Sequence, residues 1–396
     1  MVPESAARAR STGTARQATM YSRSFRGVRS CRWERASVES CMRWDFASNQ
    51  YRRIKRAVRD GFPQGRKRGK LHRMCYSAMV EQHLRSIAKD FGAEIDWPMF
   101  EELFRGRLER DIKVSRALEA NFFGPARAHS PNGMERLTLE HIEAYRARLT
   151  GKLESELFRQ KKRLVDAERS LKVKETQRAR EEARIAQNKI DAGLNRLSDL
   201  KRTEPLERDR RIFPMYYAPV VVEENDRRWI RPMRYTCRLP GKPASYDVRY
   251  PGTYNARRDN LGGFWKALYG HHHAILVITS FFENVASNLY EKRELKPDEK
   301  PRNLVLHFDP EPRTPMLVAC LWAHWRGKDG PELFSFAAIT DDPPPEIAAT
   351  GHNRCVIPVK PQNLDEWLRP EGVRLERLEE ILSDRERPFY EHRIAA

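Results

Sequence analysis

Residues 274–282, with the sequence AILVITSFF, form an apolar run that is typical of a β-strand. The same half of the chain contains further runs of this kind, and proline and glycine clusters between them predict loops. Together these segments predict an α+β fold with a mainly antiparallel, barrel-like sheet. The further runs are 217–222 (YAPVVV), 303–308 (NLVLHF), 316–322 (MLVACLW) and 333–340 (LFSFAAIT).

Helical periodicity dominates one long charged segment before these strands. Residues 134–202 place leucine and isoleucine at helical spacing on both sides of an almost wholly polar stretch at 174–184. A single helix of this length would span about 100 Å, so a helical hairpin or protruding coiled coil is the better interpretation. Flanking helices are also predicted, at 79–91, 98–108, 363–368 and 374–383.

Positive charge is concentrated at the start of the chain. The 396 residues carry a formal net charge of +19. Residues 1–73 contain 19 basic and 5 acidic side chains, whereas residues 74–396 contain 55 and 50. Residues 1–73 also lack helical or strand periodicity. We interpret them either as a disordered basic arm that contacts phosphates or as upstream sequence translated from a mis-assigned start codon, with Met74 as the true start.

The cysteine content indicates a reducing compartment. The six cysteines form no CxxC pair and no regular framework, which is typical of free thiols. No apolar run approaches the roughly 18–20 residues that span a bilayer, and the start of the chain has no secretory signal. We therefore expect a soluble, cytoplasmic protein without membrane association.

Motifs of several common enzyme classes are absent from the sequence. The chain contains no GxSxG, GxxxxGKS/T, GxGxxG or HExxH pattern. In the run His271-His272-His273, at most His271 and His273 share one face of a strand. No cysteine or carboxylate cluster lies nearby at ligand spacing. We therefore predict no metal site and no cofactor.

Separated short segments carry the functional signal. Met74-Cys75 precedes a helical pattern, Tyr254-Asn255-Ala256-Arg257 lies in a predicted loop, and Phe281-Phe282-Glu283 ends a predicted strand. The other segments are Ala319–Trp322, Ile339-Thr340, His352-Asn353-Arg354 and Trp367-Leu368. In this order and spacing they resemble the SOS-response-associated peptidase (SRAP) family, over residues 74–130 and 212–370.

The resemblance implies that Cys75 becomes the first residue of the working protein. In this family the exposed cysteine forms a thiazolidine with the aldehyde of an abasic site in single-stranded DNA. An N-terminal cysteine is required because its amine forms an imine and its thiol then closes the ring. The amine and thiol have reference pKa values of about 8 and about 8.5, so both react near neutral pH. Either translation begins at Met74 or proteolysis removes residues 1–74.

The resemblance also implies roles for six further residues. Asn255 would orient the amine or the sugar, Glu283 would shuttle protons, and His352 would assist opening of the sugar ring. The residues that would contact DNA phosphates are Arg257, Thr340 and Arg354.

Three departures from the family pattern indicate a divergent branch. Tyr76-Ser77 stands where the family usually has Gly-Arg, and Asn284 stands where it usually has tryptophan. Tyr216-Tyr217-Ala218-Pro219 lacks the asparagine that often precedes Ala-Pro. We expect the geometry of DNA binding to differ accordingly.

The leading hypothesis is abasic-site processing in the DNA damage response, at the nucleoid when the protein is bound to DNA. It includes covalent linkage to single-stranded DNA and associated lyase or autopeptidase activity. The first alternative is a thiol peptidase that acts on its own N-terminal segment through Cys75, Glu283 and His352. The second is a non-enzymatic DNA-associated scaffold that binds a protein partner through its helical insertion. The expected organisation is an N-terminal extension (1–73), a first part of the SRAP domain (74–133), a helical insertion (134–205) and a second part of the SRAP domain (206–396).

Overall fold

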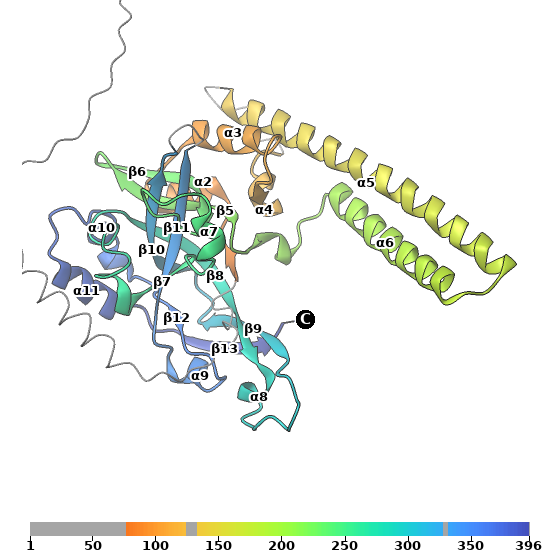
Figure 1. Ribbon diagram of the computed structural model, residues 1–396. Coiled ribbons are helices and arrows are strands. Elements are labelled where there is room, and N and C mark those ends of the chain that lie inside the picture. Colours follow the sequence, from red (N-terminus) through yellow and green to blue (C-terminus); the bar gives the residue numbers. More distant parts are fainter. Residues whose placement is uncertain (1–76, 124–132, 328–331, 396) are drawn as a thin grey trace, which may run out of the picture. The chain divides into compact units, whose positions relative to one another are not determined.

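A closed barrel of five strands forms the centre of the described structure (Figure 1). The computed structural model describes residues 77–123, 133–327 and 332–395. The barrel strands are β5 (Tyr216–Glu224), β6 (Arg227–Tyr235), β8 (His273–Ala286), β10 (Met316–Trp325) and β11 (Leu333–Asp341). They follow the order β8-β10-β11-β6-β5, and the pair Val221–Ile275 closes the ring between β5 and β8. Only the β11–β6 pair in this ring is parallel. The predicted α+β fold with a mainly antiparallel, barrel-like sheet is confirmed.

Shorter strands extend the barrel at its ends. β1 (Ser77–Val80) pairs with both β8 and β4 (Arg211–Ile212), so the start of the described chain lies against the central strand. β7 (Asn255–Arg257) and β12 (Cys355–Val356) both pair with β11. The remaining strands are β2 (Glu94–Ile95), β3 (Lys113–Val114), β9 (Asn303–Glu311) and β13 (Phe389–Ile394).

Burial on both faces of β8 explains the apolar run in the sequence. Leu276 and Ile278 belong to a core cluster that includes residues from all five barrel strands. Ile275 and Val277 belong to a second cluster, which includes residues of the flanking helices. Because successive side chains point to opposite faces of a strand, β8 has no face left for solvent. A strand in this position has a continuous apolar sequence instead of an alternating one.

Five short helices contribute to the second cluster. Three of them have side-chain caps: His83 accepts a hydrogen bond from the Ser86 N–H at the start of α2, Asp96 accepts one from the Met99 N–H at the start of α3, and Ser115 accepts one from the Leu118 N–H at the start of α4. The helices are α2 (Leu84–Phe91), α3 (Trp97–Gly106), α4 (Arg116–Ala120), α10 (Leu364–Leu368) and α11 (Leu375–Ser383). Single-turn helices occur at α7 (Tyr246–Arg249), α8 (Ser287–Tyr290) and α9 (Pro345–Ala348).

The predicted helix over 79–91 is wrong in its first part. Met79 and Val80 belong to β1, and α2 begins only at Leu84, after the cap residue His83. The backbone of β1 pairs with β8, and this long-range pairing overrides the local helical spacing. The other predicted helices at 98–108, 363–368 and 374–383 correspond to α3, α10 and α11.

The long charged segment forms a hairpin of two antiparallel helices, α5 (Met134–Val173) and α6 (Gln177–Lys201) (Figure 1). The base of α5 belongs to the core, since Leu139 and Ile142 are buried in the cluster shared with α3. Further along, the two described helices pack against each other, and a Cβ at Gly193 would lie 2.7 Å from a Leu157 methyl group. None of the helices in the described parts of the chain is long and apolar enough to cross a bilayer.

Candidate functional site

The segments that carry the predicted site residues meet at one end of β11. Thr340 of β11 pairs with Arg257 of β7 on one side and with Val356 of β12 on the other. Glu283 lies near the end of β8, and His352 lies in the loop that leads into β12. The topology therefore gathers residues that are separated by up to a hundred positions in the sequence.

Glu283 and His352 form a buried ion pair. The Glu283 side chain is fully buried, and its Oε2 lies 3.0 Å from His352 Nε2. The other ring nitrogen, Nδ1, lies 3.0 Å from the carbonyl oxygen of Arg354. A protonated His352 therefore carries its charge directly beside the Glu283 carboxylate and can donate to the Arg354 carbonyl.

The pKa of His352 is raised above its ordinary value. Burial by itself lowers this pKa, but the charge and hydrogen bond of Glu283 and the Arg354 carbonyl more than offset the effect. The imidazolium form is thus favoured beside the carboxylate. The two side chains are almost entirely shielded from bulk water, with exposures of 6% for His352 and 0% for Glu283.

Asn255 and Thr340 present polar atoms to the same buried region. The Asn255 side-chain oxygen accepts a long hydrogen bond, 3.4 Å, from the Tyr235 hydroxyl. Within the described residues, the Asn255 amide nitrogen and the Thr340 hydroxyl have no hydrogen-bond partner. A buried polar group without a partner costs roughly 1–3 kcal/mol, so two of them side by side indicate a place that a ligand or water completes.

Tyr235 is a site residue that the sequence did not reveal. Its ring stacks on Phe336, with centroids 5.2 Å apart, and meets Tyr254 edge-on at 5.6 Å. These contacts hold its hydroxyl against Asn255. The strand that carries it, RRWIRPMRY, is rich in arginine, and these charges concealed its alternation.

Arg257 is paired with acids instead of lying open to an anion. Its guanidinium forms two contacts of 2.9 Å with the Asp259 carboxylate and approaches Asp342 at 3.9 Å. Arg354 is half-buried, and its backbone N–H lies 3.3 Å from His352 Nδ1. Of the predicted residues, the structure joins Glu283 to His352 directly and places Asn255, Arg257 and Thr340 on adjacent strands.

Cys75 lies outside the described residues, which begin two positions later at β1. Ser77 of β1 pairs with Phe282, the residue before Glu283. Arg211 anchors this start, because its Nε donates to Ser77 Oγ at 3.0 Å and its guanidinium lies 3.5 Å from the Phe282 ring centre. Ser77 also borders a cavity of about 20 Å³, enough for about one water molecule.

A second histidine cluster lies on the neighbouring strand but lacks the geometry of a catalytic triad. His307 Nε2 lies 2.7 Å from Ser280 Oγ and 3.3 Å from Asp309 Oδ1. Both partners therefore contact the same nitrogen, whereas a triad uses opposite nitrogens of the ring. Burial lowers the pKa of His307, although Asp309 opposes this shift. This cluster does not support a serine hydrolase.

His273, from the histidine run, is engaged through both ring nitrogens. Nε2 accepts a hydrogen bond from the Gly270 N–H at 2.9 Å, and Nδ1 lies 3.0 Å from the Trp367 carbonyl. Burial lowers the pKa of His273 to about 3, so the ring is neutral. Neither nitrogen is available to a metal ion, and the described residues contain no group of three potential metal ligands.

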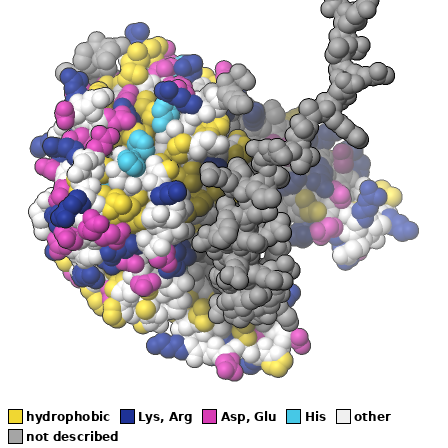
Figure 2. Space-filling model, turned by 60° about the vertical axis from the view of Figure 1, so that its left-hand side comes forward, with side chains coloured by type: hydrophobic (Ala, Val, Ile, Leu, Met, Phe, Trp, Pro, Cys, Tyr) yellow, Lys and Arg dark blue, Asp and Glu magenta, His cyan; other side chains and the backbone are white. Residues whose placement is uncertain are grey.

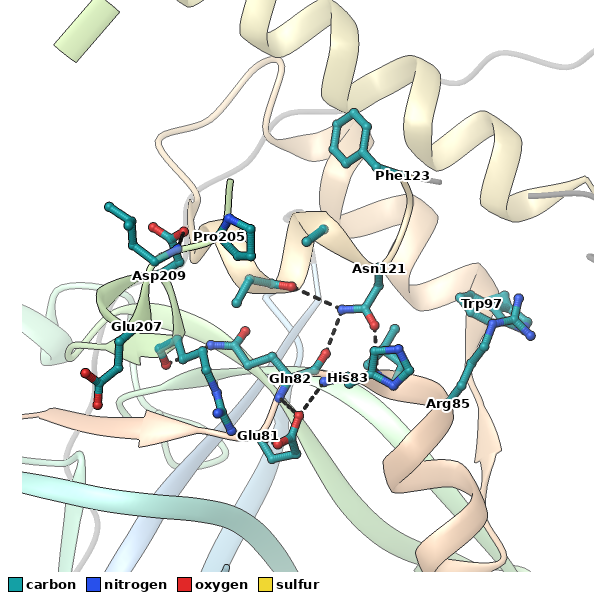
Figure 3. Close-up of a pocket in the computed structure, with 15 residues that line it drawn as sticks. Glu81, Gln82, His83, Arg85, Trp97, Asn121, Phe123, Pro205, Glu207 and Asp209 are labelled. Carbon is teal, nitrogen blue, oxygen red and sulfur yellow. Dashed lines mark hydrogen bonds and ion pairs between the residues drawn. The ribbon is translucent and has the colours of Figure 1, made fainter. Parts of the chain in front are cut away.

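Figure 3 shows a separate pocket of about 500 Å³ between the start of α2, α4 and the 3-10 helix Glu207–Arg210. Its polar groups hold one another: the Glu81 carboxylate accepts the N–H groups of Gln82 and His83, and the Asn121 amide donates to the Gln82 carbonyl. None of the predicted site residues lines it.

Charges on the described surface are mixed. On the face in Figure 2, acidic and basic side chains lie interspersed around small apolar patches. This distribution agrees with the near balance of charge in residues 74–396. Long-range attraction of a polyanion to this face is therefore weak, and recognition must depend on local contacts.

A comparison with protein families identifies the strand-rich part of the chain. Residues 174–395 match the family model described as SOS response associated peptidase (SRAP). The match starts within the hairpin, so the assignment of earlier residues to the same domain stays a prediction. No curated protein matches the chain.

Three of the solved structures to which this chain is similar come from two bacteria. A protein from Bordetella bronchiseptica is 16% identical, with a TM-score of 0.37, and the match covers 47% of this chain and 87% of that one. A phage-related protein from the same organism is 18% identical, with a TM-score of 0.35, over 47% and 80%. A protein from Bacteroides thetaiotaomicron is 15% identical, with a TM-score of 0.35, over 43% and 71%.

Proposed function

Because this chain belongs to the SOS-response-associated peptidase (SRAP) family, we propose that it captures abasic sites in single-stranded DNA through a covalent bond to Cys75. In this proposal Cys75 is the N-terminal residue, and the product is a thiazolidine. The link shields the damaged strand from breakage in the cytoplasm, at the nucleoid.

The observation that carries the proposal is the buried Glu283–His352 pair beside the start of β1. Ser77 is paired with the neighbour of Glu283, and two residues of chain span at most about 7 Å. This pairing of β1 with the strand that carries Glu283 supports a reaction of the Cys75 amine and thiol beside the ion pair. A pair of this kind can accelerate the proton transfers of imine formation at an N-terminal cysteine.

The proposed reaction moves protons at three stages. The Cys75 amine attacks the aldehyde carbon of the opened sugar, and the resulting carbinolamine loses water to form an imine. The thiolate then adds to the imine carbon, and the nitrogen takes up a proton. One C–N bond and one C–S bond form, and one water molecule leaves. Glu283 and His352 supply and accept the protons.

The remaining site residues would position the DNA. The Asn255 amide nitrogen, buried and without a partner among described residues, can donate to the sugar or orient the amine. Thr340 and Arg354 would contact backbone phosphates. Arg257 would exchange the Asp259 carboxylate for a phosphate, which suits its planar fork equally well.

The test is denaturing electrophoresis after mixing the protein with uracil-excised single-stranded DNA. A chain that begins at Cys75 should give a band that survives denaturation, and DNA with an intact base should give none. Matched chains that begin at Met1, or that retain Met74, should give none unless they are processed. A stable adduct with an unprocessed Met1 chain would overturn the N-terminal requirement.

A second function, autopeptidase action at the Met74–Cys75 bond, is favoured by the same placement. The pair that would assist imine formation also lies beside the start of β1, where the scissile bond would be. Mass spectrometry of a purified Glu283→Gln chain distinguishes the routes. Loss of processing in this variant supports self-cleavage, and unchanged processing points to an external peptidase or to translation from Met74.

A further inference from the structure

The distal part of the hairpin exposes apolar side chains that its own fold does not use. Phe158 is 75% exposed, Val165 is 50% exposed and Leu194 is 45% exposed. Phe158 and Val165 are seven residues apart on α5, so they lie two turns apart on one face of the helix. We call these three residues the hairpin stripe.

The packing between the helices places Leu194 on the same side as Phe158. The buried residues of distal α5 are Leu157, Gln160 and Ala167. Their heptad spacing marks the line along which α5 contacts α6, which we call the seam. Leu157 meets Gly193, and Phe158 and Leu194 each follow one of these two seam residues. In an antiparallel pair of helices, the residue after a seam residue points to the same side of the pair on both helices, so Phe158 and Leu194 lie on one side.

An ion pair between the two helices marks the opposite side. Arg163 and Glu182 are bonded across the pair, and each precedes a seam position. The hairpin stripe therefore borders one open side of a two-helix coiled coil. A third helix packs on such a side by inserting apolar residues between the two helices.

The charge around the stripe is positive. Residues 158–174 contain seven basic side chains and two acidic ones. Arg159, Arg163 and Arg169 have acidic partners within the hairpin. Lys161, Lys162 and Lys172 show no ion pair with any described residue. Their charge is available to an acidic partner.

We propose that the hairpin stripe is a docking site for an amphipathic helix of a partner protein, with acidic residues flanking its apolar face. The partner helix would bury Phe158, Val165 and Leu194 and pair its acids with the three lysines. This function is separate from DNA capture and does not depend on Cys75.

Two other occupants fit less well. A second copy of the hairpin would bring two positive faces together, which charge repulsion opposes. A DNA backbone would satisfy the lysines but leave the exposed phenylalanine in water. An acidic amphipathic helix satisfies both the apolar and the charged features, which neither of these two occupants does.

The experiment measures binding of two fluorescent probe peptides to the full chain. Both are designed 21-residue helices with leucine at the first and fourth heptad positions, flanked by glutamate in one and by lysine in the other. The chain should bind the glutamate probe at least tenfold more tightly. Phe158→Ala should weaken this binding about tenfold, in line with the loss of an exposed aromatic anchor.

The matched control is Val248→Ala. Val248 is 86% exposed and belongs to α7, outside the hairpin, so its loss should leave binding unchanged. Equal binding of both probes, or equal loss in both variants, would overturn the proposal. So would concentration-dependent dimerisation that Phe158→Ala abolishes, or a loss of DNA affinity in Phe158→Ala, because the occupant would then be a second copy or DNA. The altered side chains are exposed, and an unchanged circular dichroism spectrum checks that each variant is folded.

Discussion

The barrel and the hairpin place charged side chains in opposite environments. In the barrel, Glu283 is fully buried and held by His352. In the hairpin, pairs such as Glu156–Arg159 lie at the surface, with 38% and 74% of the side chains exposed. Exposed pairs contribute about 0–1 kcal/mol, whereas breaking a buried pair costs about 3–5 kcal/mol. Because burial of two charges also carries a desolvation penalty, a buried pair is the better marker of chemistry.

Apolar side chains show the reverse contrast. Leu276 of β8 is 3% exposed and surrounded by the barrel core, while Phe158 of α5 is 75% exposed. Stability explains the first position, and nothing within the fold explains the second. The two regions therefore teach one rule: a buried pair of charges, or a group of exposed apolar side chains aligned on one face, indicates a function.

The largest effect is expected at the reactive residue itself. Cys75→Ser should abolish the stable adduct with abasic single-stranded DNA, because a hydroxyl closes only to a far more labile oxazolidine. Quantifying the denaturation-resistant band for chains that begin at residue 75 measures this effect. An adduct yield equal to that of the cysteine chain would exclude the thiazolidine.

Glu283→Gln and His352→Ala should slow adduct formation by about 10²–10⁴-fold, the usual contribution of general acid–base catalysis. The affinity for single-stranded DNA should hardly change, since neither residue is expected to contact phosphate. Single-turnover rates at saturating protein, together with fluorescence anisotropy, separate the two quantities. A loss confined to affinity would contradict the assigned roles.

The pH dependence of stability provides a control for the same pair. The folded-state pKa of His352 is raised, so its stabilising contribution is fully present below the unfolded value of about 6.5 and is lost as pH rises through the folded value. In Glu283→Gln burial dominates and lowers this pKa. The dependence should then reverse, with stability from this group lost as pH falls. Denaturant unfolding at several pH values measures both trends.

Core packing gives the next largest effect. Leu276→Ala should lower the free energy of unfolding by about 3 kcal/mol, because it leaves a cavity in a closely packed barrel. The matched change Phe158→Ala should alter it by no more than about 0.5 kcal/mol. Chemical denaturation of both variants checks the contrast. A comparable loss in Phe158→Ala would show that the hairpin surface supports the fold.

The sequence predicted the strands better than the contacts around the site. Residues 274–282 were recognisable because a strand that is buried on both faces has no polar alternation. Met79 and Val80 were misplaced in a helix because their pairing with β8 is a long-range property. The contact between Tyr235 and Asn255 was equally invisible, since it depends on the parallel pairing of β6 and β7 with β11.

The resemblance to a family selected the site residues, and the structure adds their relationships. Spacing along the chain cannot reveal that Glu283 lies 3.0 Å from His352, or that Arg257 is held by Asp259. The first contact arises only when the loop that carries His352 meets the end of β8, whereas the second joins residues two positions apart in one segment. Their roles in DNA binding and catalysis stay predictions until the variants are measured.

A smaller effect is expected at Arg257. Arg257→Ala should weaken binding of single-stranded DNA and reduce the salt dependence of the affinity by about 0.7 of a unit in the log–log slope, the loss of one phosphate contact. The adduct rate at saturating protein should remain. Arg293→Ala is a suitable control, because this arginine is bound by Glu291 and Glu299 outside the site. Equal slopes for the two variants would remove Arg257 from the interface.

The smallest effect is expected from shortening the hairpin. Leu139 and Ile142 anchor the base of α5 in the core, so a deletion must spare them. Removing residues 151–199 and joining Thr150 to Leu200 with a short glycine-serine linker removes only the part whose buried residues face the partner helix. The core should keep its cooperative unfolding transition, and adduct formation should remain within about twofold, because no site residue lies in this segment.

The same deletion sharpens the contrast between the two regions. It removes the hairpin stripe completely, so binding of the glutamate probe should disappear while DNA capture persists. Independent loss of one function is the result expected when the regions share a chain but not a mechanism. If the deletion instead abolished the adduct, with the unfolding transition intact, the hairpin would have to contribute to DNA binding, and the division between a chemical barrel and a docking hairpin would be wrong.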